Sequence, residues 1–137
     1  MGGFDEQDGD KVFYVTLPWP PSVNTYWRRN GNRYFVSAKG MQFRRDVAFA
    51  CLHDRGFFSE DARLAVVIEA YPPDRRRRDI DNIGKGIFDS LEHAGVYKDD
   101  NQIDQLCIYR KPSLQGKVTV LISEIKTAHQ NQESSQS

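Results

Sequence analysis

Residues 74–104 read DRRRRDIDNIGKGIFDSLEHAGVYKDDNQID, and the organisation of the chain follows from this stretch. Its first half holds four consecutive arginines and then two carboxylates two positions apart, Asp79 and Asp81. Lys85 follows Asp81 by one helical turn, and a second acidic pair occupies residues 99–100. Carboxylates in such numbers repel one another unless a cation lies among them, and a basic run beside them suits a polyanion. Metal-dependent cutting of nucleic acid needs both features.

A strand is predicted before this stretch and a helix inside it. Arg63–Tyr71 is apolar and β-branched, so we expect a strand in the middle of a sheet, ended by two prolines. A helix is predicted from Asp79 or Asp81 to about His93, before Gly95. Its expected buried stripe comprises Ile80, Ile83, Ile87, Phe88 and Leu91.

The N-terminal half predicts a strand, a loop and a helix. Lys11–Leu17 is rich in β-branched and aromatic residues, which favours a strand. The polar, aromatic and basic loop after it includes a short strand at Arg33–Val36. Ser37 is placed as the N-cap of a helix that runs to about Asp54 and is ended by Gly56.

Two strands at Ile103–Arg110 and Lys117–Ile125 complete the order β-α-β-α-β-β. This order predicts an α+β fold, a single domain in which a mixed β-sheet carries two main helices on one side or end. Residues 11–126 form the expected domain. We expect a disordered leader at residues 1–10 and a flexible, Gln- and Ser-rich tail at residues 127–137.

Composition is that of an ordinary globular protein of 137 residues, with 39% apolar and 28% charged residues. No apolar run is long enough to cross a membrane and no signal segment opens the chain, so we expect a cytoplasmic protein without a membrane partner. Cys51 and Cys107 are solitary, which predicts neither a zinc site nor a disulfide and places both in the core. The formal net charge is zero, yet residues 27–45 hold six basic side chains and no acidic one.

The acidic residues have two interpretations. Asp81, Lys85 and Asp89 are spaced by four, so they share one helix face and can form a capped, salt-bridged surface. Alternatively, Asp79 and Asp81 belong to a metal site, because the helix that they begin follows a buried strand directly and residues 99–100 can fold back beside it. Hard oxygen ligands suit Mg²⁺ or Mn²⁺, and Asn82 adds a neutral ligand candidate. A calcium-binding EF-hand is excluded, because DDNQID lacks the required glycine and glutamate.

A metal site of this kind polarises a phosphodiester, and Lys85 can neutralise the transition state or protonate the leaving group. Phosphates are expected to bind Arg75, Arg76, Arg77 and Arg78. Residues 24–34 interleave Tyr26, Trp27 and Tyr34 with three arginines. This mixture suits stacking on unpaired bases, and a hairpin packed on the core through Trp27 is the alternative. The DNA-contacting arginines of this loop are expected to be Arg28, Arg29 and Arg33.

Several motifs, in order and spacing, resemble the RusA family of Holliday-junction resolvases. The resemblance runs from about Leu17 to Glu124. It is carried by LPWPPSVN from Leu17, VSAKG followed by FR, DRRRRDIDN with Lys85, FDSLEHAGV, and DDNQI from Asp99. It implies a RusA-like fold and a homodimeric, Mg²⁺-dependent endonuclease that places paired nicks in opposed strands of a four-way junction, with no small-molecule cofactor.

The resemblance also implies roles for single residues. The acidic metal ligands fall on Asp79, Asp81 and Asp100, the catalytic lysine on Lys85, and a DNA contact on Arg78. Asn82 and Asp99 are neighbours in the same motifs. The alternatives are a related nuclease acting on flaps, forks or other branched DNA, a non-catalytic module that binds branched DNA, and a small-molecule phosphohydrolase, which the basic aromatic loop disfavours.

Overall fold

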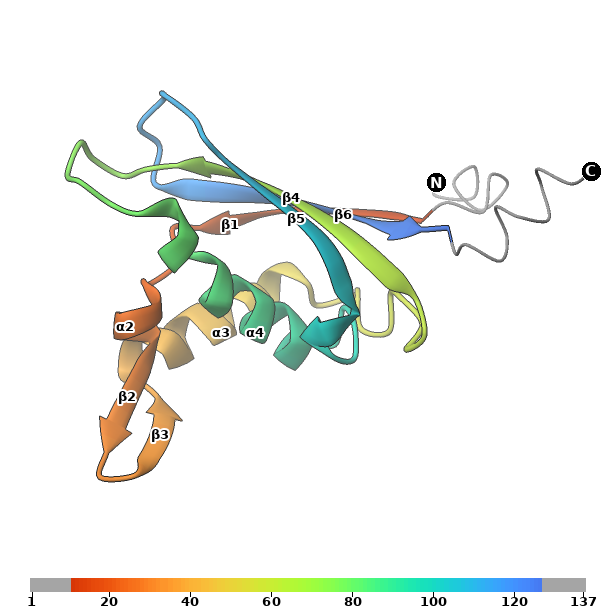
Figure 1. The fold of residues 1–137 in the computed structure, drawn as a ribbon, viewed down its shortest axis with the longest axis horizontal. Coiled ribbons are helices and arrows are strands. Elements are labelled where there is room, and N and C mark those ends of the chain that lie inside the picture. Colours follow the sequence, from red (N-terminus) through yellow and green to blue (C-terminus); the bar gives the residue numbers. More distant parts are fainter. Residues whose placement is uncertain (1–10, 127–137) are drawn as a thin grey trace, which may run out of the picture.

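A four-stranded sheet carries the helices on one of its faces (Figure 1). The computed structural model describes residues 11–126, so the expected leader and tail lie outside the described residues. The strands lie side by side in the order β1 (Val12–Pro18), β6 (Lys117–Ile125), β4 (Arg63–Tyr71) and β5 (Ile103–Arg110). β4 is antiparallel to β6 and parallel to β5, which makes the sheet mixed, as the sequence predicted.

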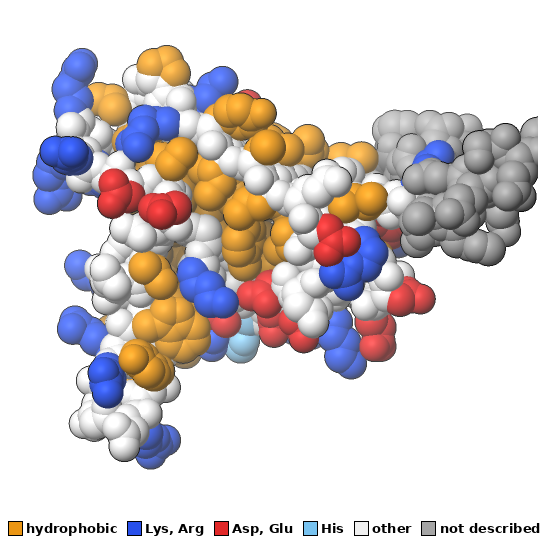
Figure 2. Space-filling view, viewed as in Figure 1, with side chains coloured by type: hydrophobic (Ala, Val, Ile, Leu, Met, Phe, Trp, Pro, Cys, Tyr) orange, Lys and Arg blue, Asp and Glu red, His pale blue; other side chains and the backbone are white. Residues whose placement is uncertain are grey.

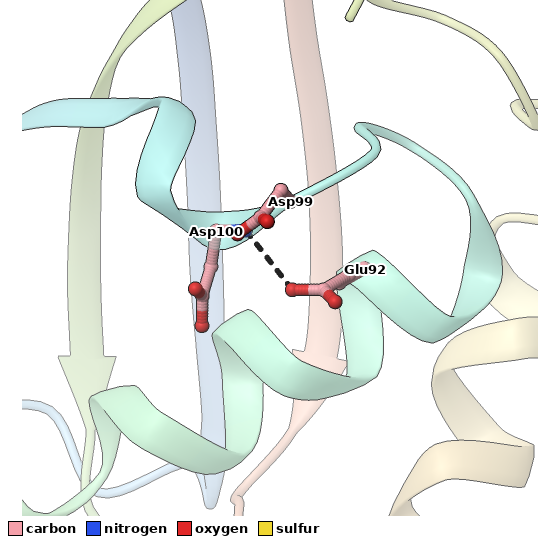
Figure 3. Close-up of side chains that lie close together, drawn as sticks. All are labelled: Glu92, Asp99 and Asp100. Carbon is pink, nitrogen blue, oxygen red and sulfur yellow. Dashed lines mark hydrogen bonds between the residues drawn. The ribbon is translucent and has the colours of Figure 1, made fainter.

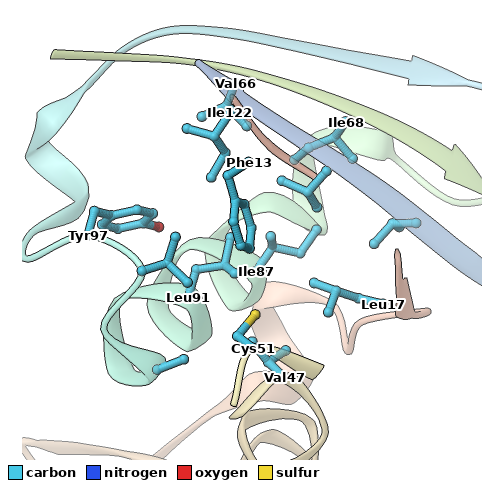
Figure 4. Packing of buried hydrophobic residues seen from close by; sticks show 14 of the residues in the cluster. Phe13, Leu17, Val47, Cys51, Val66, Ile68, Ile87, Leu91, Tyr97 and Ile122 are labelled. Atoms are coloured by element: carbon cyan, nitrogen blue, oxygen red, sulfur yellow. The ribbon is translucent and has the colours of Figure 1, made fainter. Parts of the chain in front are cut away.

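The core lies between this sheet and the helices α3 (Ala38–Ala50) and α4 (Gly84–Ala94) (Figure 4). Alternate residues of β4 face the core, because successive side chains of a strand point to opposite faces. The fully buried aliphatic side chains from the sheet and the helices include Leu17, Leu64, Ile68, Ile87, Leu91 and Ile122. Burying each such side chain contributes roughly 1.5–3 kcal/mol, so this layer supplies most of the driving force for folding.

Helix α3 begins where it was predicted and ends earlier. The Ser37 hydroxyl oxygen accepts a hydrogen bond from the Gly40 amide at 3.0 Å, as expected of an N-cap. The helix ends at Ala50, four residues before the predicted end near Asp54. The predicted end is wrong. The prediction counted Leu52 among the apolar positions of the helix, but its side chain is 64% exposed and so does not pack a further turn against the core.

Helix α4 begins later than predicted. Residues Ile80–Asn82 form a single 3-10 turn, η1, and the α-helix starts only at Gly84. Asp81 therefore precedes the helix, and the predicted common face of Asp81, Lys85 and Asp89 is wrong for its first member. The C-terminal end is correct, because Gly95 adopts the left-handed conformation, with φ 85°, that closes helices.

The segment predicted as a loop with one short strand is a hairpin. A short helix, α2 (Val23–Tyr26), leads into β2 (Trp27–Asn30), which pairs with β3 (Arg33–Val36) as a separate two-stranded sheet. The hairpin, here called the arm, projects from the body of the molecule (Figure 1). Gly31 takes the positive φ of 65° that its tight turn requires. The sequence missed β2 because arginine-rich strands carry little β signal.

The two cysteines occupy different environments. Cys51 is buried, and this burial together with the nearby Asp54 charge raises the pKa of its thiol to about 11. Cys107 lies exposed on β5, so its predicted place in the core is wrong. β5 is an edge strand, and its side chains away from the helices meet solvent. Within residues 11–126, no helix is long and apolar enough to cross a membrane.

A buried glutamine fixes the turn before β5. Residues Asp100–Gln102 form a 3-10 turn, η2, and the Gln102 side chain is 2% exposed. Its carbonyl oxygen accepts hydrogen bonds from the amides of Lys98 at 3.0 Å and Asp99 at 3.1 Å. Its NH₂ group donates to the backbone carbonyls of Ser59 and Ala62 at 3.0 and 2.9 Å. One side chain therefore ties the acidic turn to the loop before β4.

Replacing this glutamine tests how firmly the acidic turn is held. We expect Gln102→Leu to lower the free energy of unfolding by at least about 2 kcal/mol, because four backbone groups at a part-buried site lose their hydrogen-bond partner. The matched control is Gln105→Leu on β5, where the side chain is exposed and the expected change is within about 0.5 kcal/mol. Urea denaturation measures the free energy of unfolding of both variants. Equal losses in the two would contradict the role of Gln102 in holding the acidic turn.

Candidate active site and nucleic-acid interface

A groove of about 910 Å³ lies between the loop after β4 and the first turns of α3. Its two walls carry basic side chains: Arg76, Arg77 and Arg78 from the loop and Lys39 from α3. Asp79 opens into the groove beside them, and the only other carboxylate on its lining is Asp46. Figure 2 shows Lys and Arg side chains gathered at the end of the molecule that holds the arm and this loop. The groove suits an anionic strand.

The four consecutive arginines differ in exposure and in the contacts that they make. Arg78 donates to the Asp74 carboxylate at 2.7 Å, lies 5.9 Å from the centre of the Trp19 ring, and has a side chain only 19% exposed. Its guanidinium and the Arg76 amide hold the pKa of Asp74 well below its usual range. Arg78 therefore shapes the loop. Arg75, Arg76 and Arg77 are exposed to a ligand, although the Arg76 guanidinium also lies 3.4 Å from an Asp74 carboxylate oxygen.

Asp79 and Asp81 lie at the end of the connection from β4 to α4. Asp79 occupies the N-cap position of η1 in an extended conformation, and Asp81 lies within that turn. Both side chains are exposed. Neighbouring Asn82 and Ile83 line the groove with Asp79, so this turn forms the end of the groove nearest to α4.

Lys85 reaches the second acidic segment. Its ammonium nitrogen lies 3.8 Å from a carboxylate oxygen of Asp100, and the lysine side chain is 56% exposed. Lys85 forms no ion pair with Asp81 or Asp89, and Asp89 instead accepts a hydrogen bond from Arg44 at 2.7 Å. Two predicted site residues that are fifteen positions apart are therefore adjacent in the fold.

Three carboxylates gather at the turn before β5 (Figure 3). Glu92, Asp99 and Asp100 each place one oxygen within 4.8 Å of the others, and they are the one such group among the described residues. A Glu92 oxygen also accepts from the Asp100 amide at 2.9 Å. Burial raises the pKa of Glu92, and the charges of Asp100 and Asp99 add to this, against the amide hydrogen bond that lowers it.

The structure thus brings together some predicted residues and not others. Asp100 and Asp99 join the carboxylate group and Lys85 contacts it, whereas Asp79 and Asp81 stand outside the group. Their role as ligands stays a prediction. Glu92 was missed, although it lies seven residues after Lys85 and so two helical turns along the same face of α4. Lys39, which faces the arginines across the groove, was also missed as an individual contact.

The predicted aromatic and basic loop, residues 24–34, has its arginines on the surface and its three aromatic residues in different settings. Arg28, Arg29 and Arg33 are exposed. Tyr26 is fully buried, so it cannot stack on a base, and that part of the prediction is wrong. Trp27 packs partly against the core, as the alternative hairpin interpretation expected, and Tyr34 is 66% exposed.

Comparison with known proteins gives one consistent result. The family model described as Endodeoxyribonuclease RusA matches residues 18–123. A protein of Enterobacteria phage HK97 named crossover junction endodeoxyribonuclease rusA is 40% identical over 116 residues, which cover 84% of this chain and 97% of that protein. The proteins with this name from Enterobacteria phage 82 and Escherichia coli strain K12 are 37% and 38% identical over 115 residues, or 83% of this chain and 96% of each. The resemblance seen in the sequence is confirmed, and the chain belongs to the RusA family of endodeoxyribonucleases.

Proposed function

We propose that this chain is a Mg²⁺-dependent endonuclease that resolves four-way DNA junctions by paired nicks in opposed strands. The observation that carries the proposal is the basic groove that opens onto Asp79. The relatives of this chain are named crossover junction endodeoxyribonucleases. A positively charged groove fits the phosphate backbone of the DNA on which such an enzyme acts. Phosphate contacts hold a strand in position without reading its sequence, which suits an enzyme that recognises a branched shape.

The acidic residues around α4 fit a divalent cation. Their donors are carboxylate oxygens, which Mg²⁺ and Mn²⁺ prefer, and the close spacing of Glu92, Asp99 and Asp100 favours a cation that offsets their repulsion. By the family motif, the residues that would hold it are Asp79, Asp81 and Asp100. When bound, such a cation polarises the scissile phosphate and lowers the pKa of a water molecule.

The side chains around this site have separate tasks. Lys85 carries a positive charge 3.8 Å from Asp100, so it can neutralise charge on the reacting phosphate or give a proton to the leaving oxygen. Arg76 and Arg77 hold the neighbouring phosphates from one wall of the groove, and Lys39 does so from the other. Glu92 fixes the Asp100 backbone and so orients that carboxylate.

A homodimer would give the two cuts that resolution needs. A four-way junction has near two-fold symmetry, so two copies related by a two-fold axis can address two opposed strands. The face of the sheet away from α3 and α4 supports this partner. Tyr14, Leu121, Val67 and Cys107 are neighbours across the four strands on this face, and Tyr14 and Leu121 are 61% and 38% exposed. No helix of residues 11–126 covers this apolar row (Figure 1).

The function is tested with an end-labelled four-way junction and a linear duplex of the same arms, in Mg²⁺ or in EDTA. We expect symmetric nicks in the junction only, and only with Mg²⁺. Asp81→Asn should slow cleavage about 100-fold or more, because losing a few kcal/mol of transition-state stabilisation has that effect. It should still bind the junction.

The matched control is Asp61→Asn, an exposed aspartate in the loop before β4, which should cut like the wild type. Preferential cutting of flaps or forks would keep the metal site and change the substrate. Tight binding without any cleavage in Mg²⁺ or Mn²⁺ would contradict the enzymatic proposal and favour a DNA-binding module.

The dimer is tested by placing a charge in the apolar row. Wild-type protein should sediment at about twice 15.8 kDa, and Leu121→Lys should sediment as a monomer, because a buried unpaired charge opposes association. The control is Leu114→Lys, whose leucine is 42% exposed in the turn between β5 and β6 and which should remain dimeric. A wild type that stays monomeric at micromolar concentration would refute the proposed partner.

A further inference from the structure

The arm, residues 27–36, is a basic projection without acidic side chains. It carries Arg28, Arg29 and Arg33 on a two-stranded hairpin, and the sequence from residue 11 to residue 45 contains no acidic side chain. Figure 2 shows hydrophobic side chains beside these cations at the same end of the molecule. A surface that combines exposed apolar rings with unopposed positive charge suits a polyanion that has apolar groups, and DNA with unpaired bases is such a ligand.

The strand register divides the arm into two different faces. Arg29 lies opposite Tyr34 and Trp27 lies opposite Val36, so these four side chains share one face. Phe35 lies opposite Arg28 on the other face. Trp27 and Val36 pack against the core, which leaves Arg29 and Tyr34 at the outer end of the first face.

A hollow of about 440 Å³ adjoins the first face. Its lining consists of Val23, Asn24, Trp27, Arg28, Arg29 and Tyr34. The volume falls in the range of roughly 300–1,000 Å³ that small-molecule sites occupy. The lining is mostly apolar, and the Asn24 side chain is a polar group that can both donate and accept hydrogen bonds.

The rim of the hollow carries two groups that can stack on a flat ring, the Tyr34 side chain and the Arg29 guanidinium. The Tyr34 ring is 66% exposed, and the Arg29 guanidinium lies 5.6 Å from its centre. A hydrogen bond of 2.7 Å from Arg29 to the Gly31 carbonyl holds the guanidinium in this place. An aromatic ring and a guanidinium both stack on a nucleobase, whichever base it is.

The base of the arm is fixed to the helices that carry the site. The hydroxyl of the buried Tyr26 donates to Asp89 of α4, and Arg44 of α3 donates to the same Asp89 oxygen at 2.7 Å. Gly86 leaves room for the Tyr26 ring, since a Cβ there would lie 3.0 Å from it. Asp89 is one turn along α4 from Lys85, so a ligand in the hollow is held at a set position relative to the candidate active site.

We propose that the hollow beside Tyr34 receives an unpaired base from the branch point of the DNA. This inference rests on the proposed function and names the part of the substrate that the arm holds. Bases at a branch point leave the helix at less cost than bases inside a duplex, because the stack on one side of them is already interrupted. The captured base stacks between Tyr34 and the apolar lining, while Arg28 and Arg29 face the adjoining phosphates.

The test uses a four-way junction with the fluorescent base 2-aminopurine at the branch point, titrated in EDTA so that no strand is cut. Wild-type protein should change the fluorescence of the probe, because the base leaves its neighbours and stacks on tyrosine. Tyr34→Ala should lose this change and bind the junction about tenfold to a hundredfold more weakly. Tyr34→Phe, which keeps the ring, should retain both.

Phe35→Ala is the matched control, because Phe35 is also exposed, at 49%, and belongs to the opposite face of the same hairpin. It should behave as the wild type. An unchanged signal and affinity in Tyr34→Ala, or equal losses in Tyr34→Ala and Phe35→Ala, would overturn the inference. Because the titration needs no cleavage, a probe response in a protein that never cuts DNA would refute the proposed function and uphold the base site.

Discussion

The parallel pairing of β4 with β5 is the constraint on which the rest of the structure depends. Parallel neighbours cannot be joined by a tight turn, so the chain must cross over between the end of β4 and the start of β5. That crossover, residues 72–102, contains the arginine loop, η1, α4 and η2. The candidate catalytic residues Asp79, Asp81, Lys85 and Asp100 therefore lie on one connection, and the packing of α4 against the sheet determines their arrangement.

Two further attachments fix this crossover. Gln102 ties its last turn to the loop before β4, and Tyr26 with Arg44 ties the middle of α4 to the arm and α3 through Asp89. These two attachments place α4 and the turn before β5 beside each other, which brings Lys85 into contact with Asp100. The same scaffold leaves two surfaces open, the basic end with the arm and the apolar face of the sheet. We propose that the basic end binds branched DNA and that the apolar face pairs with a second copy of the chain.

Much of the fold could be predicted because apolar patterns are local. The bounds of β4 and of β5 were predicted to the residue, and Ser37 and Gly95 were recognised as helix boundaries from their chemistry. The strand order could not be predicted. β5 and β6 follow each other in sequence, yet β4 lies between them, and only packing in three dimensions decides this. The late start of α4 was also missed, because the apolar stripe of the sequence continues through η1 and does not mark where the α-helix begins.

The candidate site was predictable through its residue types and less so through its geometry. The arginine run, Lys85 and Asp100 stand out by their chemistry, and the structure does join Lys85 to Asp100. Glu92 and Lys39 gave no such signal, because a single charged residue on a helix is ordinary until its neighbours from other elements are known.

We propose that the crossover builds one cation site from its two acidic segments, residues 79–81 and 99–100. Crystals soaked in Mn²⁺ and measured at the manganese absorption edge would locate the ion directly by its anomalous signal. We predict a peak coordinated by Asp100 of the second segment together with Asp79 or Asp81 of the first. A peak held only by Glu92 and Asp99, or no peak at all at millimolar Mn²⁺, would contradict it.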